Sequence, residues 1–287
     1  MHRRIDHLVV AVRDLSKAAA FYRALGFQVG ARNRHPWGTE NHVVQMPGSF
    51  IELIAVADPA GVEPHQPGRF SFGAFIRDYL AHREGLAMLV LDSRDAAADA
   101  RAFAADGIGA FSPFSFERRA TTPDGREARV AFSLAFARDE TAPLAGFFVC
   151  HHETPDTFWN PAFQHHPNGA AGLASVALAA PEPDGRVAFL RAFTGRDPES
   201  PDAHDYSFAL DGSRLDLMTP DDAAELYGSV ETELDQPGFV AFTISVGDLA
   251  AQAARLAAAG VPCQSIGARL IVPASVAFGV AIAFEAD

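Results

Sequence analysis

The sequence has few cysteines and little positive charge. Its two cysteines, Cys150 and Cys263, are far apart and indicate neither a disulfide framework nor a zinc-binding motif. Aspartate and glutamate outnumber lysine and arginine by 36 to 23, which gives a net charge of −13. Nucleic acids and anionic membrane surfaces bind clustered basic residues, and the pairs Arg3-Arg4 and Arg118-Arg119 are too short to form such a cluster. We therefore expect no nucleic-acid partner and no membrane partner.

Long hydrophobic runs are also missing. The first six residues contain no apolar signal core, and no run approaches the ~20 residues that a membrane span requires. A hydrophobic content of 48% with 21% charged residues is typical of globular proteins with large cores. We expect a cytoplasmic protein, and the length of 287 residues predicts two domains.

The first part of the chain has the pattern of a strand, a helix and further strands. Residues 5–12 form a short apolar run rich in β-branched side chains, which favours a buried strand. Apolar side chains then recur at helical spacing up to Leu25, and Gly26 can adopt the left-handed conformation that ends a helix. Further strands are predicted at residues 27–29, 41–46 and 50–56, followed by a loop rich in proline and glycine over residues 58–75.

This order recurs three more times. The distance from the first strand to the glycine after the helix is similar in each case: Ile5 to Gly26, Leu86 to Gly107, Leu173 to Gly195 and Val240 to Gly260. The period is longer than the roughly 20–50 residues of solenoid repeats, so we interpret it as duplication of a compact module. The sequence predicts an α+β fold of four βαβββ modules paired into two domains. Turn signals at residues 122–125 and 211–212 predict hairpins within these modules.

A proline-rich segment, residues 153–168, separates the two halves of the chain. We predict an N-terminal module pair over residues 1–160 and a degenerate C-terminal pair over residues 170–287. The polar side chains of the segment, among them His166 and Asn168, are expected in a solvated linker or, alternatively, at the rim of a binding site.

The βαβββ unit that opens with residues 5–12 and closes with Phe50–Ile54 resembles the vicinal oxygen chelate superfamily. That superfamily includes glyoxalase I, extradiol dioxygenases and bleomycin-resistance proteins. The segment His35–Asn41, followed by Ile51–Ile54, is similar to its glyoxalase-like domain branch. The resemblance implies a sheet curved into a cup around a divalent metal ion, with ligands from the first and fourth strands of paired modules.

The resemblance places His7 at the first-strand ligand position of the first module and Glu52 at its fourth-strand position. In the second module the equivalent positions fall on Leu86 or Ala87 and on Cys150. The third and fourth modules offer little beyond Ser175 and Asp216. The ligand sets implied for glyoxalase I and for the extradiol dioxygenases are therefore incomplete here.

Strand alternation suggests a third ligand. His152 stands two residues after Cys150 and is expected on the same face of the strand. His7, Glu52 and His152 would then present two imidazoles and a carboxylate, which suits Zn, Fe, Mn, Ni or Co and leaves positions open for substrate. A thiolate from Cys150 would favour zinc. Alternatively, His7 is a hydrogen-bonded core residue and Cys150 a small buried hydrophobic residue.

The loop before the third predicted strand supplies candidate substrate-binding residues. Trp37, Thr39 and Asn41 are expected at the rim of the cup, together with Cys150 inside it. The alternative for the loop is an ordinary turn with exposed side chains. The C-terminal half, which lacks a ligand pattern, is expected to have a packing role, and a homodimer is a further expectation.

Two functional hypotheses follow. The first is a metal-dependent lyase, isomerase or oxygenase that acts on a small oxygenated metabolite, with Glu52 and His152 as catalytic residues. The second is a metal-free protein that binds a small molecule, as implied by the resemblance to bleomycin-resistance proteins. His7 and Glu52 favour the enzyme, whereas the missing ligands of the second module favour the binding protein.

Overall fold

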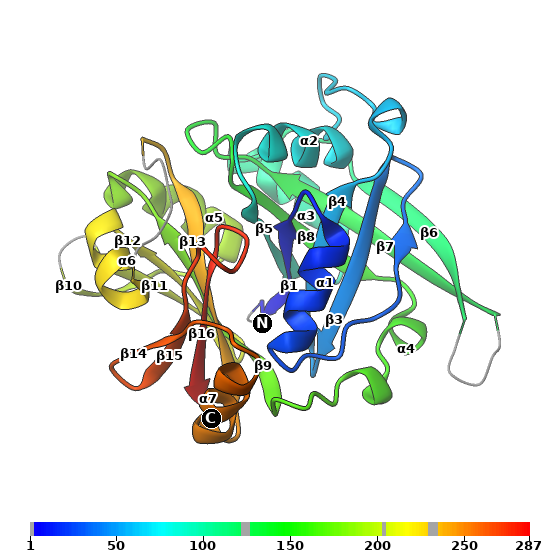
Figure 1. Ribbon diagram of the computed structural model, residues 1–287. Helices are drawn as coiled ribbons and strands as arrows, with labels where there is room; N and C mark the ends of the chain where they lie inside the picture. The colour runs from blue at the N-terminus through cyan, green and yellow to red at the C-terminus, as the bar shows by residue number, and fades with distance from the viewer. Residues whose placement is uncertain (1–2, 122–126, 203–204, 229–234) are drawn as a thin grey trace.

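The computed structural model describes residues 3–121, 127–202, 205–228 and 235–287 (Figure 1). The turn predicted at residues 122–125 lies outside these residues. Within them, no helix is both long and apolar enough to cross a membrane.

The elements of the N-terminal half follow the predicted module order twice. The first module consists of β1 (Ile5–Ala11), α1 (Leu15–Ala24), β2 (Asn33–Arg34), β3 (Thr39–Met46) and β4 (Ser49–Val56). The second consists of β5 (Gly85–Asp92), α3 (Ala96–Ala105), β6 (Phe114–Thr121), β7 (Glu127–Ala137) and β8 (Gly146–His152). Helix α2 (Phe72–His82) lies between them, and α4 (Pro155–Phe158) follows.

The C-terminal half repeats the arrangement. Its modules are β9 (Ala170–Ala179), α5 (Val187–Thr194), β10 (Glu199–Asp202), β11 (Asp205–Leu210) and β12 (Ser213–Met218), then β13 (Gly238–Val246), α7 (Leu249–Ala258), β14 (Gln264–Ile266), β15 (Arg269–Val272) and β16 (Ala281–Ala286). Helix α6 (Pro220–Tyr227) occupies the place that α2 has in the first half. The predicted fold class, four βαβββ modules in two pairs, is confirmed.

The two sheets have the same topology. The strand order is β2-β3-β4-β1-β5-β8-β7-β6 in the first sheet and β10-β11-β12-β9-β13-β16-β15-β14 in the second. Each first strand pairs in parallel with the fourth strand of its own module, as β1 does with β4. The first strands of paired modules are antiparallel neighbours, as β1 and β5 are. First-strand and fourth-strand side chains of a module therefore lie next to each other in the middle of a sheet.

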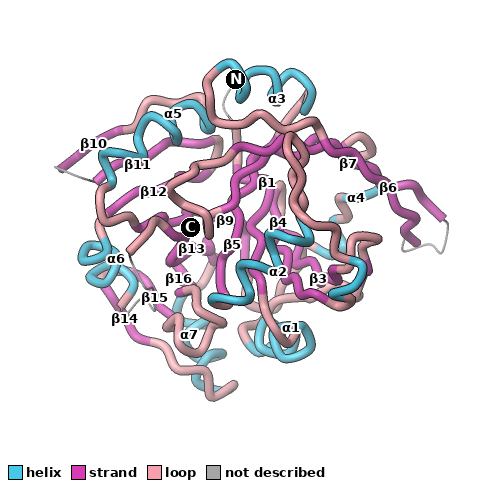
Figure 2. Tube along the Cα trace, turned by 90° about the horizontal axis from the view of Figure 1, so that it is seen from above, coloured by secondary structure: helices cyan, strands magenta, loops and turns pink. Residues whose placement is uncertain are grey.

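The two curled sheets lie side by side, with most helices around the outside of the strands (Figures 1 and 2). The main apolar core contains residues of both sheets and of α1, α3, α5 and α7. Ring contacts cross between the halves: Phe27 stacks on Phe284 at 6.3 Å, and Phe147 meets Phe193 at 5.3 Å. A second apolar cluster fills the opposite, concave face of the first sheet and includes residues of α2.

Two local predictions were wrong. Residues 27–29 are not a strand, because the N–H of Gln28 donates to Nδ1 of His166 (2.9 Å) and not to a neighbouring strand. The predicted loop over residues 58–75 contains the start of α2, whose N-cap Ser71 accepts a hydrogen bond from the N–H of Ala74. The prolines and glycines before Ser71 favour a loop, and this composition predicts a loop that extends into the capped, apolar helix.

The end of the segment between the halves is buried and not solvated, whereas residues 161–163 and His165 are exposed. His166 and Asn168 are both buried. Asn168 Nδ2 donates to the carbonyl of Leu25 (3.0 Å), and His166 Nε2 bonds the carbonyl of Gln45 (2.6 Å). The end of the segment is therefore attached to the first module.

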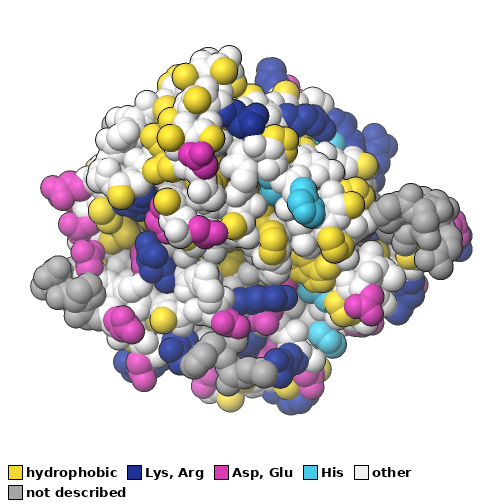
Figure 3. Space-filling view, turned by 90° about the horizontal axis from the view of Figure 1, so that it is seen from below, with side chains coloured by type: hydrophobic (Ala, Val, Ile, Leu, Met, Phe, Trp, Pro, Cys, Tyr) yellow, Lys and Arg dark blue, Asp and Glu magenta, His cyan; other side chains and the backbone are white. Residues whose placement is uncertain are grey.

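On the surface, acidic and basic side chains are interspersed, as one face shows (Figure 3).

Candidate functional site

The concave face of the first sheet encloses a small aromatic pocket. Its cavity has a volume of about 60 Å³. A water molecule occupies roughly 10–15 Å³ on such a scale, so there is space for a few waters or a small organic group. Aromatic side chains form most of the wall: Trp37, Phe50, Phe72, Phe114, Phe116, Phe132, Phe148 and Phe158. The polar lining consists of His7, His35, Asn41, Glu52, Arg118 and Cys150.

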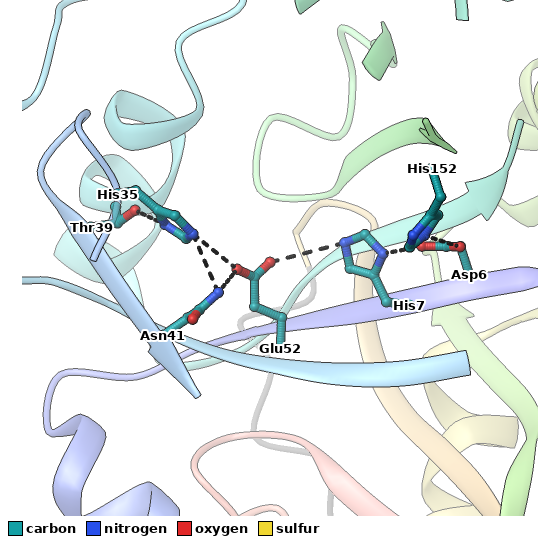
Figure 4. A network of polar contacts seen from close by, with 7 residues as sticks. All are labelled: Asp6, His7, His35, Thr39, Asn41, Glu52 and His152. Carbon is teal, nitrogen blue, oxygen red and sulfur yellow. Dashed lines mark hydrogen bonds and ion pairs between the residues drawn. The ribbon is translucent and has the colours of Figure 1, made fainter. Parts of the chain in front are cut away.

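Glu52 lies at the centre of a row of polar side chains along the sheet (Figure 4). Asn41 Nδ2 donates to Glu52 Oε1 (2.5 Å) and also to His35 Nε2 (3.4 Å). The other ring nitrogen of His35 is hydrogen-bonded to Thr39 Oγ1 (2.8 Å). His35 Nε2 is therefore an acceptor that faces Glu52 Oε1 at 4.0 Å. Burial lowers the pKa of His35, the charge of Glu52 raises it, and the charge of Arg118 lowers it. The net effect is a lowered pKa, which favours the neutral ring.

On the other side of Glu52 the row continues through β1. His7 Nε2 faces Glu52 Oε2 at 3.9 Å, and His7 Nδ1 lies 2.6 Å from Asp6 Oδ1. The second carboxylate oxygen of Asp6 lies 2.9 Å from His152 Nε2. Asp6 is thus shared by two histidines, and it is fully buried.

The protonation of Asp6 determines the tautomer of His7. Burial alone raises the pKa of Asp6, but His152 and His7 together outweigh it and lower the pKa to about 2. An ionised carboxylate can only accept, so His7 donates through Nδ1. In the neutral ring, Nε2 then presents a lone pair to Glu52. The ring is held in this orientation by stacking on Phe50, with centroids 4.2 Å apart.

His152 lies beyond Asp6. Its Nδ1 atom is buried and has no hydrogen-bond partner among the described residues. In the described part of the chain, Asp6, Cys150 and His152 form the one group of three or more possible metal ligands whose ligand atoms all lie within 4.8 Å of one another. Burial, with the charges of Asp6 and Glu52, raises the pKa of the Cys150 thiol well above its usual value, so the thiol is neutral.

The structure thus brings some predicted residues together and separates others. His7 and Glu52 face each other, and Trp37, Asn41 and Cys150 line the pocket. Thr39 is behind His35. His152 is held by Asp6 and is not among the residues that line the pocket.

Asp6 and Arg118 have no role at the site that the sequence predicts, and His35 is predicted only as a residue of the rim loop. Asp6 escapes prediction because strict alternation places it on the opposite face from His7. The pairing of β1 with β5 shifts between Ile5 and His7, so Asp6 is the extra residue of a β-bulge. Arg118 does leave a signal, since it follows Phe114 and Phe116 at every second position of β6. His35 is visible in the sequence only as part of the loop motif.

The two atoms that face each other, His7 Nε2 and Glu52 Oε2, are suitable ligands for a divalent metal. Two acceptors that face each other at 3.9 Å are too far apart to share a hydrogen bond. Typical metal–nitrogen and metal–oxygen distances add up to about 4.1 Å, which is the largest separation that one ion can bridge, so the two atoms lie just within reach of a single ion. A carboxylate that orients the far nitrogen of a ligand histidine, as Asp6 does for His7, is common around metal sites.

In the second sheet the two corresponding side chains, Ser175 and Asp216, are both engaged in hydrogen bonds. Ser175, at the position of His7, donates to Thr243 Oγ1 (2.9 Å). Asp216, at the position of Glu52, accepts hydrogen bonds from Ser207 (2.8 Å) and Arg214 (3.0 Å). The candidate site is therefore confined to the first sheet among the described residues.

Comparisons with known proteins agree with this fold. The model of the glyoxalase-like domain family matches residues 5–194. A search of curated proteins finds no match. Among solved structures, a hypothetical protein from Staphylococcus aureus has a TM-score of 0.73 at 12% identity, with 99% of this chain and 100% of that chain covered.

Two further structures have enzyme names. The Mn(II)-bound glyoxalase from Novosphingobium aromaticivorans has a TM-score of 0.55 at 13% identity, and the match covers 100% of this chain and 83% of the glyoxalase chain. A mutant of 4-hydroxymandelate synthase from Streptomyces coelicolor has a TM-score of 0.57 at 14% identity, with 91% and 76% covered. At these identities the likeness shows the fold alone. The match over residues 5–194 shows the family: the chain belongs to the glyoxalase-like domain family, with the vicinal oxygen chelate fold.

Proposed function

We propose that the chain is a divalent-metal-dependent enzyme, a lyase, isomerase or oxygenase, that acts on a small oxygenated metabolite in the aromatic pocket. The supporting observation is the arrangement of Asp6, His7 and Glu52, in which a buried carboxylate orients an imidazole lone pair toward a second carboxylate. We also propose that the protein is cytoplasmic and that its partner is a small molecule.

His7 and Glu52 would hold the metal, and His152 is the proposed third ligand. Its buried Nδ1 lacks a partner among the described residues, which is costly unless a ligand or water satisfies it. When bound, the metal would act as a Lewis acid on the oxygens of the substrate. The solved relatives that are named as a glyoxalase and a synthase, one of them Mn(II)-bound, support a metal enzyme without identifying the ion.

The residues of the chain divide the remaining tasks. The phenylalanine wall binds the apolar part of the substrate and excludes water, which strengthens polar interactions inside the pocket. Glu52 or the neutral His35 would move a proton, and general acid–base catalysis typically contributes 10²–10⁴-fold in rate. Asn41 keeps Glu52 and His35 in register through its two hydrogen bonds.

A metal-free binding protein is the second candidate. It is favoured by the position of His152, since His7, Glu52 and His152 do not form a compact ligand group in the described part of the chain. In that case His7 and Glu52 would be polar groups that bind an organic ligand directly.

Metal analysis separates the two candidates. Protein purified without an affinity tag would be treated with a chelator, incubated with Mn²⁺, Fe²⁺, Co²⁺, Ni²⁺ or Zn²⁺, and analysed by plasma mass spectrometry. We expect uptake by the wild type, a sharp loss in His7→Ala and Glu52→Gln, and no change in Asp216→Asn, the equivalent position of the second sheet. His152→Ala tests the third ligand. No uptake by the wild type would refute the enzyme proposal.

A further inference from the structure

Strand β6 presents one cation to the aromatic pocket. Side chains alternate between the two faces of a strand, and Phe114, Phe116 and Arg118 all line the pocket. The neighbouring charged residues on the other face are paired: Glu117 with Arg129 at 2.6 Å, and Arg119 with Glu127 at 3.4 Å. Arg118 is thus the inward-facing exception on this strand.

Arg118 has no hydrogen-bond or ion-pair partner within the described residues, although it is half-buried. Glu52 acts on it through space without forming an ion pair, and the pKa of Arg118 is lowered by burial against the effect of that charge. His35 and Arg118 line the same pocket, and the charge of Arg118 contributes to lowering the pKa of His35. The guanidinium and Glu52 therefore line the same cavity without forming an ion pair.

A half-buried cation against apolar walls has lost part of its hydration without gaining a protein partner. A ligand with a negative group would supply that partner, and a planar carboxylate matches the two parallel N–H donors of a guanidinium. A phosphate dianion fits less well, because Arg118 is the only arginine or lysine among the described residues that line the pocket, and Glu52 adds negative charge.

From these contacts we infer that the pocket binds a small aryl or similarly apolar carboxylate, with its ring among the phenylalanines and its carboxylate on Arg118. The inference rests on the proposed function in that it names the substrate class of the same pocket. The opposite end of the ligand would face Glu52 and His7.

The test compares two probes of nearly equal shape, phenylacetate and its neutral analogue phenylacetamide. Dissociation constants would be measured by calorimetry on the full-length protein, as purified. We expect the wild type to bind phenylacetate about tenfold more tightly, since hydrogen bonds to charged groups contribute this much or more. Arg118→Gln should abolish the preference by weakening phenylacetate, and Arg118→Lys should restore part of it. Arg119→Gln, one residue away on the opposite face, is the matched control and should behave as the wild type.

Three results would overturn the inference: equal affinity of the wild type for both probes, a preference that survives in Arg118→Gln, or no saturable binding of phenylacetate. Circular dichroism would establish that each variant is folded, and the comparison of the two probes on the wild type tests the inference even where a variant does not fold. The metal content of the same samples separates this inference from the proposed function. Charge preference without metal uptake refutes only the metal enzyme, whereas metal uptake without charge preference refutes only the role of Arg118.

Discussion

Asp6 and His7 are consecutive residues of β1, yet their side chains meet, with Oδ1 of Asp6 2.6 Å from Nδ1 of His7. In a regular strand they would point to opposite faces. The bulge between Ile5 and His7 brings both to the concave side, where Asp6 also reaches His152.

The first prediction concerns this contact. Asp6→Asn keeps the size of the side chain but removes the charge that fixes the tautomer of His7. We expect metal affinity to fall by about 10–100-fold, as is typical when such a partner of a ligand histidine is lost. Competition with a chromophoric chelator would measure the affinity. Asp216→Asn is the control, and an unchanged affinity in folded Asp6→Asn would show that Asp6 does not orient a metal ligand.

The second prediction concerns the two tryptophans. Trp37 lines the pocket and stacks on His35 at 4.6 Å, whereas Trp159 stacks on His152 at 5.3 Å and is not part of the pocket wall. Phenylacetate should therefore change the fluorescence of Trp37 more than that of Trp159. The measurement uses Trp159→Phe and Trp37→Phe, each with one tryptophan left. Tight binding that leaves Trp37 emission unchanged would contradict a role of this loop in the site.

The third prediction concerns acid stability. Burial lowers the pKa of His166, although its hydrogen bond to Gln45 partly opposes this effect. The unfolded chain therefore takes up a proton near pH 6.5 while the folded chain does not, so the stabilising contribution is complete above that pH and is lost as the pH falls toward the folded pKa. Urea unfolding at about pH 7.5 and about pH 5.5 should show a larger loss of stability in the wild type than in His166→Gln.

His165→Gln is the control for this prediction. His165 is the exposed neighbour of His166 and bonds the carbonyl of Pro161 (2.7 Å). The charge of His165 is the smallest of the effects on the pKa of His166, so we expect this variant to keep most of the pH dependence of the wild type. Equal pH dependence of the wild type and His166→Gln would exclude His166 as the titrating group.

The fourth prediction concerns the division into residues 1–160 and 170–287. Limited proteolysis should first cut the exposed part of the intervening segment near Phe163, which is 42% exposed, and not the buried part at His166–Asn168. Because the main core contains residues of both halves, the two fragments should remain associated and unfold together. Gel filtration and thermal unfolding of the cleaved protein measure this. A first cut within residues 85–91 or 239–246, which are buried strands, would be inconsistent with the fold.

The modules are predictable from the sequence because their pattern depends on local periodicity and on glycines that end helices. His7 and Glu52, which the resemblance assigns to one site, lie close together because their positions are on neighbouring parallel strands of one module. Asp6 could not be predicted in the same way, because a bulge depends on the pairing of two strands and leaves no signal in one of them.

Arg118 shows a different limit. In the sequence it belongs to a basic pair that is too short to bind nucleic acid, and only its position in the folded sheet gives it a role. Helix α2 shows a third limit of prediction from sequence. It begins directly after a proline-rich stretch, so the composition at its start is that of a continuing loop.

The end strands of the first sheet, β2 and β6, are not hydrogen-bonded to each other. The interval between them is spanned by rings: Trp37, just after β2, lies 4.9 Å from Phe116 and 5.4 Å from Phe114. The same three rings also line an outer hollow of about 280 Å³. The barrier between the pocket and this hollow is therefore made of side chains, which can rotate without breaking any backbone ladder. Passage through this seam requires only that these rings rotate, and the sheet that carries His7 and Glu52 stays intact.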